Sequence, residues 1–131
     1  MVQLGTIVKV SDKTSVVLGQ CIKVLGQKKK RIAFIGDVIL LSVQWINAKR
    51  FVFLKARLQK IFYKGAVHRA LIIRSKVNFC RIRGVHIKFN ENAVILVTKN
   101  IAPIANRVYG PILLEMCLRW NSLGCVSTCI I

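Results

Sequence analysis

The segment VQLGTIVKVSDKTSVVLGQCIKV, residues 2–24, contains two runs in which apolar and polar side chains largely alternate. Val2–Val10 and Val16–Val24 have the period of two that is typical of half-buried β-strands. Ser11–Ser15 lies between them and has the polar composition of a turn. The chain is therefore expected to begin with two strands joined by a turn.

Short segments of the same kind recur along the chain. Asp37–Trp45 follows Gly36 and is nearly all apolar, as expected for a central strand, with Asp37 fixing the turn before it. Val67–Lys76 alternates again, and a hairpin with Gly84 near its tip follows. His86–Phe89 and Ala93–Thr98 continue the pattern around a turn at residues 90–92. Regular spacing of short strands predicts a mainly β protein, and specifically a barrel, which leaves no exposed sheet edges.

Phe51–Lys64 departs from this pattern. Its sequence favours one basic amphipathic helix, and a long hairpin arm is the competing interpretation. The apolar residues at helical spacing are Phe51, Leu54, Leu58 and Ile61, and the cations that share another face are Arg57, Lys60 and Lys64.

The C-terminal segment is predicted to hold a short helix and a strand. The run ILLEMCLRW after Gly110 fits a helix with Pro111 in its first turn, where proline is tolerated. Glu115 would offset the helix N-terminus or pair with Arg119. Gly124–Ile131 could form a last strand.

Composition points to an anionic partner. The 131 residues are 54% hydrophobic, enough for one domain with a core, yet 22 Lys and Arg face only 4 acids and give a net charge of +18. Positive charges in such excess repel one another and attract polyanions. Nucleic acid is therefore the leading candidate partner and an anionic membrane the second. The uncharged runs are too short to span a membrane, and residues 1–10 lack the pattern of a signal or transit peptide.

The sequence shows no catalytic or metal-binding motif, so we predict no enzyme, no cofactor and no metal site. The four acids stand singly, and no nucleotide-binding or hydrolase motif is present. His68 and His86 are expected to be packed or RNA-facing. The five cysteines are scattered and odd in number, which indicates small apolar core residues in a reducing compartment. They are Cys21, Cys80, Cys117, Cys125 and Cys129.

The functional prediction rests on where the positive charges lie in the sequence. Lys28–Arg31 is a loop of four adjacent cations between two strand-like segments, and no acid interleaves with it. An unpaired surplus of this size destabilises the fold unless a partner neutralises it, so we predict phosphate binding. The candidate RNA-binding residues are Lys23, Lys28, Lys29, Lys30, Arg31, Arg69, Arg74, Lys76, Arg81, Arg83, Lys88 and Arg107.

Few aromatic residues interleave with these cations, apart from Phe79, Phe89 and Tyr109. Backbone and shape recognition of folded RNA is therefore favoured over base stacking. The alternative is a free RNA-binding translation factor with an oligonucleotide-binding barrel, which would need aromatic platforms on one sheet face.

Four stretches resemble the universal large-subunit ribosomal protein L-fourteen family. CIKVLGQKKKRIAFIGD (21–37) is similar to the family's CIKVLG, a basic loop that ends in two cations, and a GD turn. The other three follow in the family's order, with ALIIRSK (70–76) like AVVVRTK, IKFNENAVILV (87–97) like IRFDxNAxVLL, and RVYGPILLEM (107–116) like RIFGPVxRELR.

The resemblance implies a small closed five-stranded β-barrel with a projecting β-hairpin and short C-terminal helices. It also implies a structural rRNA-binding protein at the subunit interface of the large subunit, which helps form an intersubunit bridge with small-subunit rRNA. The implied protein neighbours are the ribosomal proteins L-nineteen and L-three, and a ribosome-silencing factor on the exposed face. Among the four loop cations, Lys30 and Arg31 match the family's pair.

This chain also departs from the family. SDKTSV (11–16) replaces ADNSGA and keeps only Asp12, and Leu114 and Cys117 replace two cations. Residues 48–63 include sequence that the family mostly lacks, so we expect a single domain over residues 1–131 with a lineage-specific insertion there. The divergence, and the abundance of Ile, Lys, Asn and Phe, favour a mitochondrial ribosome, with a plastid or bacterial ribosome as the alternative.

Overall fold

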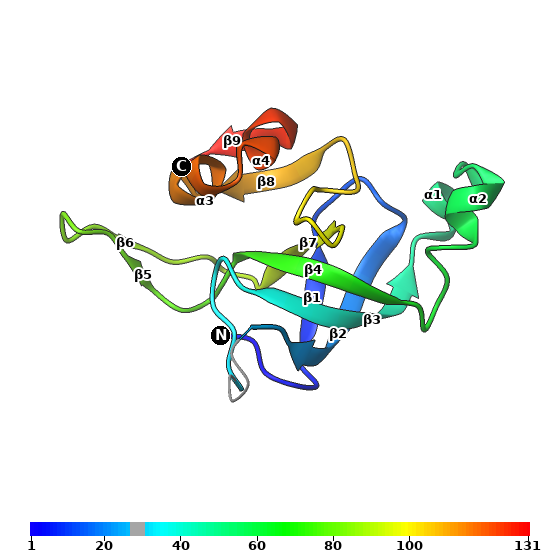
Figure 1. Ribbon diagram of the computed structural model, residues 1–131, viewed down its shortest axis with the longest axis horizontal. Coiled ribbons are helices and arrows are strands. Elements are labelled where there is room, and N and C mark those ends of the chain that lie inside the picture. Colours follow the sequence, from blue (N-terminus) through cyan, green and yellow to red (C-terminus); the bar gives the residue numbers. More distant parts are fainter. Residues whose placement is uncertain (27–30) are drawn as a thin grey trace.

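Five strands close into a barrel in the computed structural model, which describes residues 1–26 and 31–131 (Figure 1). Neighbouring strands are antiparallel except where β7 closes the barrel by pairing in parallel with β1, with Lys9 opposite Ala93. The predicted barrel and its number of strands are confirmed. In order around the barrel, the strands are β1 (Ile7–Val10), β2 (Val16–Val24), β3 (Val38–Ile46), β4 (Val67–Arg74) and β7 (Ala93–Val97).

The first strand is shorter than the alternation predicted, because a turn separates Val2 from β1. Val2 forms an isolated bridge to Ala33, and Thr6 donates a backbone hydrogen bond to Gln3. The predicted turn at 11–15 is present, but it is largely buried. Asp12 is 2% exposed and accepts hydrogen bonds from the backbone N–H groups of Leu96 and Thr14.

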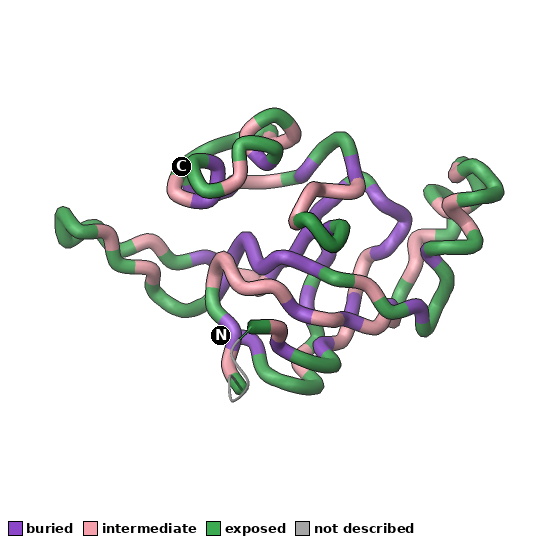
Figure 2. Tube along the Cα trace, viewed as in Figure 1, coloured by how far each residue is buried: buried purple, intermediate pink, exposed green. Residues whose placement is uncertain are grey.

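Two strands are buried on both faces and separate two apolar cores. In β4, Ala70 and Ile72 face the barrel interior, whereas Leu71 and Ile73 pack against the C-terminal segment. All residues of β7 are likewise buried (Figure 2). Because each fully buried aliphatic side chain contributes roughly 1.5–3 kcal/mol, these two strands hold the barrel and the C-terminal segment together.

The C-terminal segment contains β8 (Val108–Ile112), α3 (Leu114–Arg119), α4 (Asn121–Val126) and β9 (Ser127–Ile130). The prediction for Pro111 was wrong, because Pro111 lies in β8 and the helix begins at Leu114. β8 and β9 pair in parallel, with Pro111 opposite Cys129. The predicted last strand is shorter than expected, since residues 121–126 are helical.

A hairpin of β5 (Phe79–Cys80) and β6 (His86–Ile87) projects from the barrel (Figure 1). Gly84 lies in its tip with a φ of 78°, and its N–H donates to the carbonyl of Arg81. The predicted hairpin and the position of Gly84 are confirmed.

Residues 48–64 fold into two short helices, α1 (Ala48–Val52) and α2 (Ala56–Gln59), rather than one continuous helix or a hairpin arm. Lys55 interrupts them with an extended backbone at φ −57° and ψ 144°. The break lets Leu54, Leu58 and the buried Phe62 all pack against the barrel core. A continuous helix was predicted to use Ile61 instead, which is 41% exposed.

Candidate nucleic-acid interface

The acids of this chain are all engaged inside the protein. Asp12 is buried at the end of β1, and Asp37 accepts a hydrogen bond of 2.8 Å from the Phe34 N–H in the turn before β3. Glu91 and Glu115 form ion pairs with Lys9, Arg74 and Arg81. With every acid occupied in this way, a net charge of +18 remains for an external partner.

Two of the candidate cations lie side by side on the barrel wall. Lys23 on β2 and Arg69 on β4 are both exposed and flank Leu40 of β3 in register. Arg31, the last of the four adjacent cations, is exposed as well. Lys28, Lys29 and Lys30 lie outside the described residues, so their predicted role stays a prediction.

The fold adds two cations that the sequence did not single out. A depression of about 270 Å³ is lined by Arg69, Lys99 and Arg119 together with Gly26 and Trp120. The Arg119 guanidinium stacks over the Trp120 ring, 4.7 Å from its centroid. Nothing in the local sequence indicates that Lys99 and Arg119 are neighbours, because Lys99 follows β7 and Arg119 is the last residue of α3. Only the tertiary fold places them beside Arg69 and Gly26.

The hairpin and its base carry a second group of candidates. Arg83 near the tip and Lys76 and Lys88 at the base are exposed. Arg81 instead ties the hairpin to the C-terminal segment, with its Nε 2.5 Å from Glu115 Oε1 and its Nη2 2.8 Å from the Ile131 carbonyl. The hydrogen bond from Arg81 lowers the pKa of Glu115. Of the two roles predicted for Glu115, its position in the first turn of α3 agrees with the first, an acid near the helix N-terminus, whereas the predicted pairing with Arg119 is wrong because Arg81 is the partner.

Arg107 stands apart from both groups, exposed in the loop before β8, where its carbonyl accepts a hydrogen bond from the backbone N–H of Lys13. The exposed candidates thus lie on strands β2 and β4, on the hairpin and its base, and in the loop before β8.

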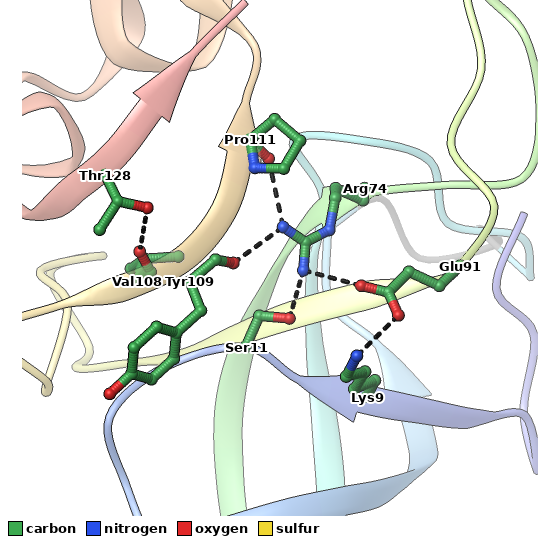
Figure 3. A network of polar contacts seen from close by, with 8 residues as sticks. All are labelled: Lys9, Ser11, Arg74, Glu91, Val108, Tyr109, Pro111 and Thr128. Atoms are coloured by element: carbon green, nitrogen blue, oxygen red, sulfur yellow. Dashed lines mark hydrogen bonds and ion pairs between the residues drawn. The ribbon is translucent and has the colours of Figure 1, made fainter.

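Arg74 differs from all the other candidates because its side chain is only 5% exposed (Figure 3). Its guanidinium donates to the carbonyls of Tyr109 at 2.9 Å and Pro111 at 3.3 Å, to the Ser11 hydroxyl, and to Glu91 at 3.0 Å. Burial lowers the pKa of Arg74. The guanidinium joins β8 to the barrel, and as the structure stands its charge faces the protein rather than a phosphate.

The residues around Arg74 pair with its guanidinium or leave space for it. Glu91 also accepts a hydrogen bond of 2.9 Å from Lys9, and that bond is the main cause of the lowered pKa of Glu91. Gly110 has a φ of 84°, and a Cβ there would lie 2.3 Å from Arg74 Nη1. A glycine at position 110 is therefore needed for the arginine to reach the β8 carbonyls.

The remaining predicted residues have structural surroundings. His68 is half-buried, with its Nε2 3.0 Å from the Ile61 carbonyl and its ring against Phe62. Phe89 belongs to the second core and Phe79 packs against it, so neither gives a free stacking surface. Tyr109 is 41% exposed and lies beneath the Arg50 guanidinium.

Within residues 1–26 and 31–131, no cluster of three or more His, Cys, Asp or Glu could hold a metal ion, and no helix is long and apolar enough to cross a membrane. The cysteines are free. Cys21 and Cys117 are buried as predicted, but Cys80, Cys125 and Cys129 are exposed, which corrects their assignment to the core.

A small, strongly basic β-barrel whose acids are all engaged internally is typical of a nucleic-acid-binding structural protein. The sequence pattern of the family described as "Ribosomal protein L14p/L23e" matches residues 1–131. The chain is also 38% identical over 112 residues to the "Large ribosomal subunit protein uL14c" of Helicosporidium sp. subsp. Simulium jonesii. That match covers 86% of this chain and 84% of the relative.

The chain therefore belongs to the ribosomal protein L14 family. This is a family of non-enzymatic, structural constituents of the large ribosomal subunit. The resemblance found in the sequence and the prediction that the chain is not an enzyme are confirmed.

Proposed function

We propose that this protein binds large-subunit rRNA by charge neutralisation and shape fit, with its cationic surfaces inserted between rRNA helices. The observation that supports this most is that all four acids have partners within the protein while cations remain exposed on the barrel strands, on the hairpin and in the loop before β8. The alternative, a free oligonucleotide-binding factor, is disfavoured because Phe89 is buried, Phe79 is packed and the Tyr109 ring is covered by Arg50.

The test uses the tagged chain in its native cells and follows it through sucrose gradients. Wild type should sediment with large subunits at low salt and leave them only at high salt, because each neutralised phosphate contributes a slope of roughly −0.7 to −0.9 in log K against log salt. Charge reversal of Lys23, Arg69 and Lys99 should reduce incorporation, whereas the charge-preserving Lys23→Arg and Arg69→Lys should not. Recovery of the wild-type chain as a free monomer would refute the proposal.

We propose further that the protein lies at the subunit interface and contributes to a bridge with small-subunit rRNA. Its protein neighbours would be L-nineteen and L-three, with a ribosome-silencing factor as a further partner. The resemblance in sequence supports these contacts. Cross-linking of intact ribosomes followed by mass spectrometry tests them, and cross-links confined to the solvent side of the large subunit would contradict them.

The proposed compartment is the mitochondrion, with the plastid or a bacterial cytoplasm as the alternative. Divergence and composition support an organelle, and the similarity to the uL14c protein of Helicosporidium supports the plastid as the alternative. Fractionation of the source cells with an antibody to the chain decides between them. Recovery with plastid ribosomes alone would overturn the mitochondrial assignment.

We also propose that residues 1–131 form a single domain and that residues 48–63 are an insertion. Deletion of the insertion should leave the barrel folded but less stable, because the deleted helices lie at one end of β3 and the deletion also removes the buried Phe62 from the barrel core. Loss of the β-sheet signal in circular dichroism would contradict this division.

A further inference from the structure

The α1–α2 elbow, residues 48–64, lies at the opposite end of the molecule from the hairpin (Figure 1). We propose that this elbow binds an unpaired stretch of RNA, with bases stacked on Phe53 and Tyr63 and phosphates held by the surrounding cations. The proposal rests on the proposed function and adds to it a site and a form of RNA.

The elbow carries unbalanced charge. The chain has no acid between Asp37 and Glu91, and the ion pairs recorded in the described residues involve Lys9, Arg74 and Arg81, none of which belongs to the elbow. A surface of this kind is complementary to an anion. The exposed cations of the elbow are Lys49, Arg50, Lys55, Arg57, Lys60 and Lys64.

Arg50 serves a different purpose from the other five. Its guanidinium lies over the Tyr109 ring, 5.5 Å from the centroid, and so connects α1 to β8. Burial raises the pKa of Asp12, and the positive charge of Arg50 is one of the contacts that oppose this rise. The five other cations are left to contact phosphates.

Two aromatic side chains of the elbow are exposed although the segment is anchored. Leu54, Leu58 and Phe62 pack against the barrel core, and Phe62 is only 2% exposed. Phe53 is 90% exposed and Tyr63 is 55% exposed. Anchored aromatic rings amid cations are the arrangement that single-stranded RNA favours, because every unpaired base offers a face for stacking.

Other partners fit this surface less well. A duplex presents phosphates but no free base face, so it would use the cations and leave the two rings unused. A membrane-surface helix lays a continuous apolar face into the lipid. Here α1 and α2 have 5 and 4 residues, and the apolar face of the elbow is already packed on the barrel.

The binding test uses the full chain with two fluorescent probes, a twelve-nucleotide oligouridine and a twelve-base-pair RNA duplex. The paired substitution Phe53→Leu with Tyr63→Leu removes the aromatic faces and keeps apolar bulk at exposed positions, so folding should be unaffected. It should weaken oligouridine binding by about tenfold or more, on the basis of stacking energies for single bases. Duplex binding should change by less than about twofold.

The matched control is Phe34→Leu, at a ring that is 47% exposed outside the elbow, and it should leave both affinities unchanged. Charge reversal of Lys55, Arg57 and Lys60 should weaken binding of both probes. It should also lower the salt slope for oligouridine, by roughly 0.7 for each phosphate that the variant no longer neutralises. Unchanged oligouridine affinity in the paired Leu variant, or an equal reduction for both probes, would overturn the proposal.

A second test uses the native particle and separates this proposal from the proposed function. Ultraviolet irradiation of purified large subunits should yield uridine adducts on the peptides that contain Phe53 or Tyr63. If the paired Leu variant sediments with large subunits but adducts are absent from wild type, the elbow proposal fails and the rRNA-binding function stands. Cross-links to another protein at these residues, or vesicle binding that depends on the two rings without oligouridine binding, would also overturn it.

Discussion

Replacing Arg74 by methionine is expected to loosen the C-terminal segment from the barrel. The guanidinium joins β8, β1 and the turn before β7 through hydrogen bonds to the carbonyls of Tyr109 and Pro111, to Ser11 and to Glu91 (Figure 3). Methionine has similar length and fills the space, but it donates no hydrogen bond.

The magnitude follows from what remains after the substitution. Two carbonyl oxygens and a buried hydroxyl are left without this donor, at about 1 kcal/mol each by the lower range for unsatisfied groups. Glu91 is 39% exposed and keeps Lys9 at 2.9 Å, so removal of its ion pair with Arg74 adds less than about 1 kcal/mol. The free energy of unfolding should therefore fall by about 3 kcal/mol, which lowers the melting temperature by about 12 °C for a chain of this size.

The assay is urea denaturation of the full chain followed by circular dichroism, with equal slopes for wild type and variant. Lys76→Met is the control because Lys76 is exposed two residues further along the chain, and its effect should stay within about 0.5 kcal/mol. If Arg74→Met is as stable as this control, the hydrogen bonds of the buried arginine do not hold the segment, and the reasoning is refuted.

Three further predictions concern the glycine turn, the elbow anchor and the C-terminal ion pair. Gly110→Ala should destabilise the protein by about 2 kcal/mol or more in urea denaturation, since it combines backbone strain with a distance of 2.3 Å between the new Cβ and Arg74 Nη1. The control Gly65→Ala has open space around it and should cost about 1 kcal/mol. Phe62→Ala should cost about 3–5 kcal/mol and Phe53→Ala less than about 0.5 kcal/mol, and equal effects would contradict the anchoring role. The pKa of Glu115 is lowered from 4.5, so its carboxylate stabilises the fold above that pH, and this contribution disappears as the pH falls through the lowered pKa. Glu115→Gln should therefore flatten the decline of the urea midpoint below about pH 5. An unchanged pH profile in this variant would argue against the ion pair.

The barrel was predictable because its strands follow local rules. Val16–Val24 was predicted with its observed bounds, and the predicted strands at 37–45 and 67–76 lie within one or two residues of β3 and β4. Alternation of apolar and polar side chains with a period of two indicates which face of a strand is buried, and this pattern can be recognised from neighbouring residues alone. The hairpin was predictable for the same reason, because its tip glycine and flanking strands are adjacent in the chain.

The predictions that failed depended on distant partners. Pro111 looked like the first turn of a helix, but pairing of β8 with β9 keeps it extended. Glu115 had a plausible partner one turn away, yet the hairpin brings Arg81 to it. The elbow had helical periodicity, but two short helices fit Leu54 and Phe62 onto the barrel better than one straight helix.

The sequence by itself determined the class of this protein. Strand periodicity and a surplus of 18 positive charges specify a basic β-barrel with an anionic partner, because composition and alternation do not depend on how the chain folds back on itself. Only the tertiary structure decided which cations are available to that partner. Arg74 and Arg81 have intramolecular acceptors, and Lys99 and Arg119 line one depression with Arg69, since the availability of a charge depends on neighbours that are far away in the chain.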